Sequence, residues 1–448
     1  MKQLGLMTAL YLTRKADKMP ASGRQVLQAQ RLEELLRYTR AHSPYLAQKY
    51  KDIPADAPLS AYPPANKQEM MQNFDSWMTD PAITLERVRR FMEDKDNIGR
   101  LLDGKYHVYS TSGSTGEPCI ALYDRTAFHV SSAIGVLRSF ARAQDMKAFL
   151  KSGRKTMALY ADDGFYLGCG SVRYNLRKMP WKKNTMMTCD VRKPMKEIVD
   201  TLNRFQPSMI GCYPTALELI AAEQETGRLH IRPAIIMTGG EKLTDPVRAH
   251  LEQVFGCYVQ TNYSCTEGGT MACDCTEHHF HINDDWVILE AVDENDRPVP
   301  PGTQSARVLL TNLSNRTCPF IRFEITDRVT VNREACPCGC DRPWLTLEGR
   351  TDDILIFRNG VRIAPLSLYA VLKEVEGLRR FQLLQQADDR LELRLTGEER
   401  EDCFQRAREV LSGYLMQNGV CAEIFLSDLP PQANPISGKF KHIVAFRR

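Results

Sequence analysis

The sequence predicts a layered α/β protein with a small α+β domain at its C-terminal end. Two short apolar runs, 155–160 and 234–237, are typical of buried strands, and each is followed by a turn that contains Gly or Asp. The segment 245–255, which lies between strand-like runs, has the spacing of a helix. This succession of strands and helices is the pattern of layered α/β folds, in which ligands bind at the ends of strands.

The length of the chain calls for more than one core. It has 448 residues, of which 43% are apolar, enough for two or three domains and too much for one simple core. We expect a boundary just before Arg350, with a large N-terminal domain over 1–349 and a C-terminal domain over 350–448. The second domain would have about 100 residues, a normal domain size.

Periodicity assigns the elements at both ends of the chain. Apolar residues recur at helical spacing over 22–43, so a helix is expected there. In the C-terminal domain we expect two strands, one tight turn and two helices, at 354–357, 391–395, Asn359-Gly360, 366–375 and 399–417.

Charge and hydropathy exclude several classes of protein. The net charge is only +4, and Lys and Arg are scattered among acidic residues, so no nucleic-acid footprint is evident. The apolar stretch 4–12 is too short to span a bilayer and does not have the form of a secretory signal. We therefore expect a cytoplasmic protein with no membrane partner, and a homodimer is left open as its assembly.

A hydroxyl- and glycine-rich segment is the first candidate site. The run is Thr111-Ser112-Gly113-Ser114-Thr115-Gly116. Its glycines allow the backbone to approach phosphate oxygens, and its hydroxyls are short donors. Such clusters alone are most often ordinary surface loops, and this one is not a Walker P-loop, because no Gly-Lys-Ser/Thr follows the glycines.

The order of motifs along the chain favours a phosphate-binding role for this segment. After it come five further motifs: Thr238-Gly239-Gly240-Glu241, Tyr263-Ser264-Cys265-Thr266-Glu267, Ile321-Arg322-Phe323-Glu324-Ile325-Thr326-Asp327, Gly349-Arg350-Thr351-Asp352-Asp353 and Pro435-Ile436-Ser437-Gly438-Lys439. In this order they resemble the core motifs of the adenylate-forming superfamily, and most closely its phenylacetate-CoA ligase branch, over roughly the whole chain.

The resemblance implies a large layered α/β domain of adenylate-forming type and a small mobile C-terminal lid. It also implies AMP-forming activation of a carboxylic acid with ATP and Mg²⁺, release of pyrophosphate, and acyl transfer to CoA. A carboxylate that attacks the α-phosphate brings negative charge toward negative charge, so such catalysis depends on positioning and on cations.

Residue roles follow from the same resemblance. Tyr263 would stack on adenine, Thr266 would touch the α-phosphate, and Glu267 would hold Mg²⁺. Lys439 would bridge the acyl carboxylate and the phosphate. Asp352 at the proposed domain junction is expected to be a hinge, because Lys439 and an incoming thiol cannot easily occupy the same approach to the acyl carbon; an ordinary solvated turn aspartate is the alternative. The remaining nucleotide contacts would come from Ser112, Gly113, Ser114, Thr115, Gly116, Gly239, Gly240, Glu241, Asp327 at the ribose and Arg350 near it.

Three positions depart from the pattern of the resembled family. Glu117 stands where the glycine loop usually carries Lys, Ser264 replaces a Gly, and Phe323 replaces a Tyr. An acidic residue beside triphosphate removes a cation and puts the rate of pyrophosphate departure in doubt. Backbone amides and Mg²⁺ would still favour nucleotide binding.

Two clusters of soft ligands suggest zinc. They are Cys273-Asp274-Cys275 with His278, His279 and His281, and Cys336-Pro337-Cys338-Gly339-Cys340. Two short knuckles around one tetrahedral Zn²⁺ would make a closed structural site. The resemblance favours Cys275, His281, Cys336 and Cys338 as ligands, with Cys273, His278 and Cys340 as rivals and free thiols as the alternative. The isolated cysteines are expected to be reduced, buried apolar residues.

The substrate and the acyl acceptor are the least determined. In the resembled family, the segments of Tyr160, Tyr213 and Pro214 border the acyl pocket; their aromatic rings suit an aryl or arylacetic acid, but core packing explains them equally well. An amine, an amino acid or a carrier protein could replace CoA as acceptor. A separate class, a zinc-stabilised nucleic-acid binder, is suggested only by the knuckles and a pI of about 8.3.

Overall fold

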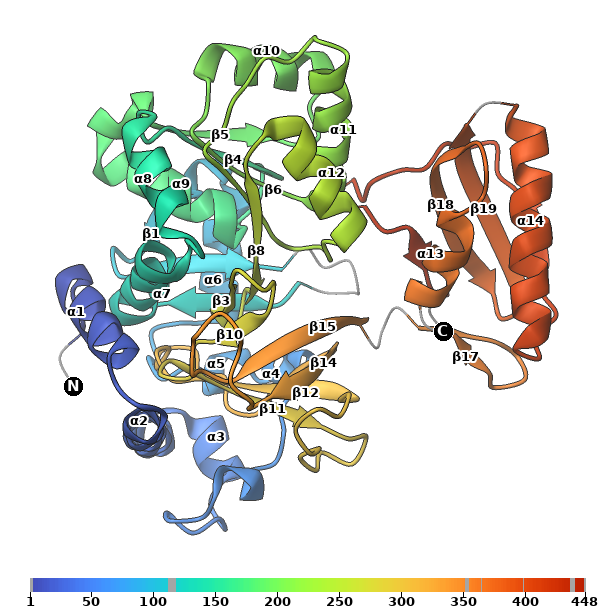
Figure 1. Cartoon of the computed structure of the whole chain (residues 1–448). Helices are drawn as coiled ribbons and strands as arrows, with labels where there is room; N and C mark the ends of the chain where they lie inside the picture. Colours follow the sequence, from blue (N-terminus) through green and yellow to red (C-terminus); the bar gives the residue numbers. More distant parts are fainter. Residues whose placement is uncertain are drawn as a thin grey trace. The chain divides into compact units, whose positions relative to one another are not determined.

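The computed structural model describes residues 3–111, 118–350, 354–363, 365–397, 399–435 and 440–446 (Figure 1). These residues form two compact units. The first contains the chain up to Ile325 together with 329–347, and the second contains 326–328, 348–435 and the residues from 440 onward. Whether 1–349 and 350–448 fold as independent domains stays a prediction.

A nine-stranded mixed sheet forms the centre of the first unit. Its order is β14-β15-β10-β9-β8-β7-β6-β4-β5. The strands from β5 to β8 run parallel, and β9, β10 and β15 continue the sheet in antiparallel pairs. The bounds are β4 (Thr156–Tyr160), β5 (Met186–Asp190), β6 (Met209–Cys212), β7 (Ile235–Thr238), β8 (Tyr258–Cys265), β9 (Gly269–Asp274), β10 (Phe280–Ile282), β14 (Asp327–Asn332) and β15 (Trp344–Arg350).

Helices follow the parallel strands, as expected for a layered α/β fold. They are α9 (Leu167–Lys178), α10 (Met195–Phe205), α11 (Pro214–Glu225) and α12 (Asp245–Phe255). Apolar side chains of three helices, such as Leu202, Leu217 and Leu251, form one core with strand residues such as Ile210 and Ile236. The predicted strands at 155–160 and 234–237 and the helix at 245–255 are confirmed.

Two smaller sheets and a set of short helices build a second, larger core. The sheets are β1-β2-β3 (Leu101–Leu102, Tyr106–Ser110, Ile120–Tyr123) and β11-β12-β13 (Val287–Val292, Arg307–Asn312, Phe323–Ile325). The helices are α3 (Pro44–Lys49), α4 (Lys67–Gln72), α5 (Phe74–Trp77), α6 (Leu85–Glu93) and α7 (Arg125–Arg138). A further helix, α8 (Ala143–Lys151), contributes no residue to this core. Trp77, which is fully buried, lies in this core together with Tyr263 and Met271 of the large sheet.

The chain begins with two helices, α1 (Leu6–Asp17) and α2 (Ala21–His42). The second confirms the helix expected at 22–43. Helix α1 packs against α7, where Ala9 shares a small apolar cluster with Ala133 and Trp286. No helix among the described residues is long and apolar enough to cross a membrane.

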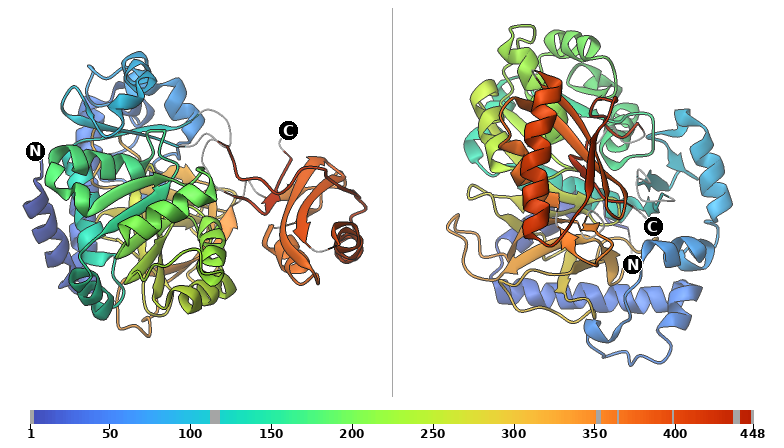
Figure 2. Two further views of the ribbon diagram at one scale, coloured as in Figure 1. Left: turned by 90° about the horizontal axis from the view of Figure 1, so that it is seen from above. Right: turned by 90° about the vertical axis from the view of Figure 1, so that its right-hand side faces the viewer.

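The second unit is a four-stranded sheet, ordered β20-β19-β18-β21, with two helices and a small hairpin. Figure 2 shows α14 lying along one face of this sheet, where its residue Leu411 packs with Leu393 of β19. The bounds are β16 (Leu355–Ile356), β17 (Arg362–Ile363), α13 (Pro365–Lys373), β18 (Leu378–Ala387), β19 (Arg390–Gly397), α14 (Arg400–Gln417), β20 (Glu423–Leu426) and β21 (Ile443–Val444).

The structure of this unit has four strands that were not predicted: β17, β18, β20 and β21. The two helices and the strands at 354–357 and 391–395 are confirmed. The longest strand that was missed is β18, which pairs with β19 along most of its length. The expectation that isolated cysteines are buried is wrong for Cys421, which is exposed, and only partly right for Cys257.

Candidate functional site

The candidate nucleotide motifs of the first unit lie where the central sheet changes from parallel to antiparallel pairing. Strand β8 occupies the middle of the nine strands; it is parallel to β7 and antiparallel to β9 (Figure 1). Gly239 to Glu241 follow β7, and Thr266 and Glu267 follow β8. Because parallel neighbours end at the same edge, the two motifs emerge side by side, the position at which α/β sheets bind ligands.

The glycine pair after β7 is adapted to close backbone approach. Gly240 has φ of +80°, a left-handed conformation that a residue with a Cβ adopts only with strain. A Cβ added to Gly239 would lie 3.9 Å from the carbonyl oxygen of Asn262 on β8. The turn therefore keeps its backbone next to the neighbouring strand.

Glu241 connects this turn to the next segment of interest. Its Oε2 atom accepts hydrogen bonds from the backbone N–H of Thr215 (3.2 Å) and from the Thr215 hydroxyl (2.8 Å). Thr215 lies in the first turn of α11, directly after Pro214, so Glu241 satisfies one free backbone donor of this helix N-terminus. The nucleotide motif and the Tyr213-Pro214 segment are thus held together.

Glu267 is the most unusual acid at this edge. Its side chain is buried, only 7% exposed, and burial raises the pKa of its carboxyl group. A backbone N–H, the thiols of Cys265 and Cys119, and the charge of Lys67 oppose that shift of the pKa without cancelling it, and no ion pair to Glu267 occurs among the described residues. A buried carboxylate without a partnered cation is a favourable ligand for Mg²⁺, since the metal would supply the missing charge.

The backbone around Glu267 is fixed from two directions. The hydroxyl of Tyr123 on β3 donates to the carbonyl oxygen of Thr266 (2.9 Å), and the side-chain amide of Asn312 on β12 donates to that of Glu267 (2.9 Å). Two other sheets therefore hold the turn from β8 to β9, which restricts where the carboxylate can go.

The structure also shows the surroundings of four other motif residues. Tyr263 is buried in the large apolar core, its ring 6.4 Å from that of Phe280. Phe323, the departure from Tyr, is also buried and packs edge-on against Phe320 at 5.0 Å. Ser264 is exposed, and Asp327 begins β14.

Two tyrosines named as pocket residues form one aromatic pair. Tyr160 ends β4 and Tyr213 follows the adjacent β6, so both lie at the carboxyl edge of the sheet. Their ring centroids are 4.9 Å apart in an edge-on arrangement. A Cβ at Gly211 would lie 3.2 Å from the Tyr160 hydroxyl, so this glycine makes room for the ring.

The two cysteine knuckles converge on one point. The side-chain ligand atoms of Cys275, His281, Cys336 and Cys338 all lie within 4.8 Å of one another. Cys275 and Cys336 have their sulfurs 3.9 Å apart, and the Cys338 sulfur is 3.2 Å from Nε2 of His281. Separations of this size suit four ligands around one tetrahedral Zn²⁺.

A second contact orients the imidazole in this tetrad, by which we mean these four residues. Nδ1 of His281 lies 3.1 Å from the carbonyl oxygen of Arg342. A proton at Nδ1 would donate to that carbonyl and leave the Nε2 lone pair directed to the tetrad, the usual arrangement of a metal-binding histidine.

The rival residues have other partners. Cys273 packs in the cluster under α1 and accepts from the Asn283 amide at 3.8 Å, and His278 stacks on Tyr258. Cys340 donates its backbone N–H to the Cys338 sulfur (3.4 Å). His279, which the sequence analysis placed in the first cluster but named neither as a ligand nor as a rival, lies 3.3 Å from the Cys336 sulfur and stacks on Trp344 at 3.8 Å.

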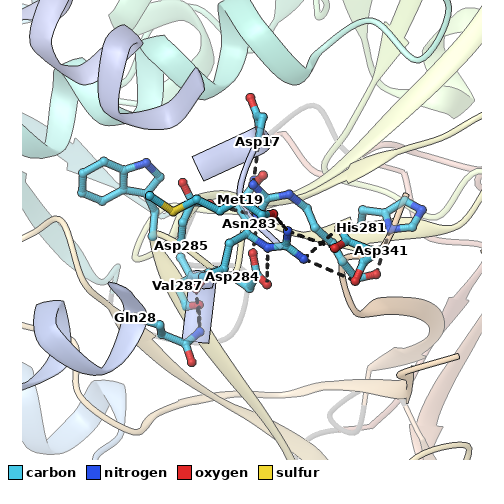
Figure 3. Close-up of polar contacts among 12 residues, drawn as sticks. Asp17, Met19, Gln28, His281, Asn283, Asp284, Asp285, Val287 and Asp341 are labelled. Carbon is cyan, nitrogen blue, oxygen red and sulfur yellow. Dashed lines mark hydrogen bonds and ion pairs between the residues drawn. The ribbon is translucent and has the colours of Figure 1, made fainter. Parts of the chain in front are cut away.

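A network of buried ion pairs includes Asp341 and Arg342, the two residues directly after the second cysteine knuckle. Arg342 bonds to Asp17 at the end of α1 (3.0 Å), and Arg24 of α2, which is 1% exposed, bonds to Asp284 (3.2 Å) and Asp341 (2.9 Å) (Figure 3). The residues directly after the second knuckle therefore contact the junction of the two N-terminal helices.

Asp285 is the centre of this network. It is fully buried and receives both arms of the Arg138 guanidinium, at 2.8 and 3.0 Å. Arg342 lies 3.1 Å away and Arg31 3.9 Å. Burial alone would raise the pKa of Asp285, but Arg138, Arg342 and Arg31 outweigh it, so that the pKa is lowered.

Several predicted positions lie outside the described residues. They are Ser112, Gly113, Ser114, Thr115, Gly116 and Glu117 of the glycine loop, Asp352, and Lys439; the side chain of Arg350 also lies outside them.

Proteins with similar sequences include coenzyme A ligases and a protein named CapK. The chain is 25% identical over 423 residues to a phenylacetate-coenzyme A ligase of Thermus thermophilus, which spans 90% of this chain and 87% of the relative. It is 23% identical to the enzyme of that name from Pseudomonas putida and 24% identical to the protein CapK of Staphylococcus aureus. No protein-family model matches the chain.

Solved structures show the same fold. 2-Hydroxyisobutyryl-CoA ligase, crystallised in the postadenylation state with an acyl-adenylate, aligns with a TM-score of 0.69 at 18% identity, over 97% of this chain and 92% of that one. An anthranilate CoA ligase with anthranoyl-AMP aligns with a TM-score of 0.51 over 75% of this chain. The predicted resemblance is confirmed: the chain is similar in sequence to phenylacetate-coenzyme A ligases and has the fold of 2-hydroxyisobutyryl-CoA ligase.

Proposed function

We infer that this chain is an AMP-forming acid–thiol ligase. It activates a carboxylic acid as an acyl-adenylate, releases pyrophosphate, and passes the acyl group to coenzyme A. The observation that carries this inference is similarity to phenylacetate-coenzyme A ligases along nine-tenths of the chain, joined to a fold that relatives use with acyl-AMP and CoA bound.

The chemistry proceeds by two displacements. A carboxylate oxygen of the acid attacks the α-phosphorus of ATP, and pyrophosphate leaves; the CoA sulfur then attacks the acyl carbon, and AMP leaves. In the first step Glu267 would hold Mg²⁺, which supplies positive charge to the phosphates. Lys439, from the Pro-Ile-Ser-Gly-Lys segment, is proposed to bridge the reacting carboxylate and phosphate.

The nucleotide is proposed to lie along the edge formed by the ends of β7 and β8. Gly239, Gly240 and Thr266 offer backbone or hydroxyl donors there, and the glycine loop 112–116 would complete the phosphate site. Tyr263 is proposed to face adenine, with Asp327 and Arg350 near the ribose. Asp352 is proposed as the hinge between the adenylation and transfer steps, because Lys439 and an incoming thiol need the same approach to the acyl carbon.

An aromatic acid is the proposed substrate. The edge-on pair of Tyr160 and Tyr213 at the carboxyl edge of the sheet supports a flat aryl or arylacetic group next to the pair. Other small organic acids are the competing class. An amine, an amino acid or a carrier protein is the competing acceptor.

The tetrad is proposed to hold one structural Zn²⁺. Four protein ligands fill a tetrahedral shell and leave no position for a reactive water. The geometry of the four donors and the carbonyl partner of His281 support this assignment. A cytoplasmic location and a homodimer stay predictions from the sequence.

The test is release of pyrophosphate from ATP with a panel of aryl, arylacetic and aliphatic acids, with and without CoA. We expect acid-dependent release and, with CoA, formation of a thioester. Lys439→Ala should slow adenylation by roughly 100-fold or more while thioester formation from preformed acyl-adenylate survives. Acid-independent release of pyrophosphate, or transfer only to amines, would overturn the proposed function.

A further inference from the structure

The amino ends of β4 and β5 carry a concentration of positive charge. The two strands are parallel neighbours, with Thr156 paired to Met186, and β5 is an outermost strand of the nine-stranded sheet (Figure 1). The segments that lead into them, 146–156 and 176–186, contain four basic residues each and no acidic residue. Since the whole chain has a net charge of only +4, the positive charge of these two segments exceeds that of the entire protein.

Most of these cations have no partner that would neutralise them. Lys155 donates to the carbonyl oxygen of Phe205 (3.0 Å) and Arg177 to that of Asp96 (2.8 Å). The other six form no ion pair within the part of the chain that the structure describes, and five of them are exposed, whereas Lys182 is half-buried. We call these six residues the basic corner: Lys147, Lys151, Arg154, Lys178, Lys182 and Lys183.

Two large apolar side chains are exposed in the same two segments. Trp181 is 73% exposed and lies in the short 3-10 helix Pro180–Asn184 between α9 and β5; Leu150, near the end of α8, is 46% exposed. The other three tryptophans of the chain are buried or half-buried. An exposed indole and an aliphatic side chain among lysines form the combination that binds at the surface of a bilayer, where the ring lies at the level of the headgroups.

We propose that the basic corner, together with Leu150 and Trp181, is a docking surface for an anionic phospholipid membrane. Each cation that reaches such a surface strengthens binding by about fivefold. Leu150 favours lipid over nucleic acid, because bases stack on aromatic rings and gain little from an aliphatic chain. The proposal does not depend on the proposed function. It revises the expectation of no membrane partner, which concerned only spanning segments and secretory signals.

Docking at this corner would leave the nucleotide edge of the sheet uncovered. The corner precedes β4 and β5, at the amino ends of the parallel strands, whereas Gly239 to Glu241 follow the carboxyl end of β7. A strand of five residues, such as β4, separates the two edges by about 17 Å. A membrane could therefore hold the enzyme without contact with the residues proposed for the chemistry.

The experiment measures sedimentation of the full chain with vesicles of phosphatidylcholine mixed with phosphatidylglycerol, and with vesicles of phosphatidylcholine alone. We expect binding to the anionic vesicles only, and weaker binding as the salt concentration rises. Phospholipids with brominated acyl chains in the anionic vesicles should quench the fluorescence of the exposed Trp181, and Trp181→Ala should remove this quenching.

Two double variants with the same change of net charge test the location. Lys151→Glu/Lys183→Glu reverses one exposed cation in each segment and should weaken binding to the anionic vesicles by about 100-fold or more. Lys51→Glu/Lys105→Glu reverses two exposed lysines outside the segments and should bind nearly as well as the unmodified protein. All four side chains are exposed, so the melting temperatures should stay equal.

Three results would overturn the proposal. The unmodified protein could fail to bind anionic vesicles, or the two double variants could lose the same affinity for them. Tighter binding to poly(U) or to polyglutamate than to the vesicles would instead assign the corner to a nucleic acid or to an acidic protein.

Discussion

Asp285 and Glu267 are both buried acids of the larger unit, but they differ in whether arginine side chains compensate their charge. Asp285 is fully buried and surrounded by the guanidinium groups of Arg138, Arg342 and Arg31, which together lower its pKa. Glu267 is 7% exposed, and burial raises its pKa because no ion pair among the described residues compensates its charge.

The difference separates a carboxylate that serves the fold from one reserved for a ligand. Asp285 lies at the junction of α1, α2, α7 and the second knuckle, where paired charges fix one arrangement of distant segments. Glu267 lies at the end of the central strand, where the backbone is held but the charge is not neutralised. An uncompensated buried charge destabilises the free protein, and a cation bound with ATP would remove that cost.

The largest effect on stability is expected when the paired acid is removed. Asp285→Asn removes the bidentate carboxylate partner of the buried Arg138 guanidinium and leaves it only the ion pair with Asp17, which should lower the free energy of unfolding by about 3 kcal/mol. Asp341→Asn is the control, because Asp341 bonds to Arg24 in the same network but its side chain is 58% exposed; there the loss should stay below about 1 kcal/mol. Denaturant unfolding measures both, and equal losses would refute the central role of Asp285.

Substitution of Glu267, the acid without an ion pair, should affect activity more than stability. Glu267→Gln removes the proposed Mg²⁺ ligand and should slow acid-dependent pyrophosphate release by about 10²- to 10³-fold. Titration of the reaction with Mg²⁺ measures this effect, and the variant should need more metal to reach its lower rate. A variant with the same rate and the same Mg²⁺ dependence as the unmodified enzyme would show that Glu267 is not a ligand.

A smaller, local effect is expected where the network meets the tetrad. Cys338→Ser should reduce the zinc content, about one ion per chain in the unmodified protein, whereas Cys273→Ser should retain it. Because Asp341 and Arg342 bond to Arg24 and Asp17, loss of the metal should speed amide hydrogen exchange in α1 and α2 by about tenfold. Equal metal content in the two variants, or unchanged exchange after chelation, would contradict this account.

The elements that the sequence predicted are those whose pattern is local. The helix at 245–255 and the strand at 391–395 could be found because their apolar residues repeat at the spacing of the element. Strand β18 was missed because Gln382 and Gln385, although buried, have the side chains of surface residues. Their amides are satisfied only by segments at least twenty-nine residues away, apart from the nearby carbonyl of Asp388.

The residues of the candidate site also divide into those that a local sequence pattern indicates and those that only the folded chain brings together. The order of the motifs made Glu267 a candidate site residue. The two cysteine clusters made the four tetrad residues candidates, because the residues of each cluster lie close together in sequence. The choice among rival cysteines depends on which way each side chain points. No pattern in the sequence indicated the Asp285 network, because its hydrogen bonds and ion pairs join residues that are far apart in sequence. Arg24 and Asp284, for example, are 260 positions apart.

The pH dependence of stability tests the comparison between the two acids most directly. The raised pKa of Glu267 means that the folded protein keeps this proton after the unfolded chain has lost it. The unfolding free energy therefore falls as pH rises from the ordinary glutamate value through the raised one. For Asp285 the sign is opposite: its lowered pKa stabilises the fold above the ordinary aspartate value, and that contribution is lost as pH falls through the lowered one.

The decisive measurement is the melting temperature of the unmodified protein and of Glu267→Gln, without nucleotide and with Mg²⁺-ATP, at about pH 5 and about pH 8. Without nucleotide, the variant should be the more stable protein at the higher pH, and its advantage should shrink at the lower pH. Mg²⁺-ATP should raise the melting temperature of the unmodified protein more than that of the variant. A variant that is less stable than the unmodified protein at the higher pH, with an equal response to Mg²⁺-ATP, would contradict the account.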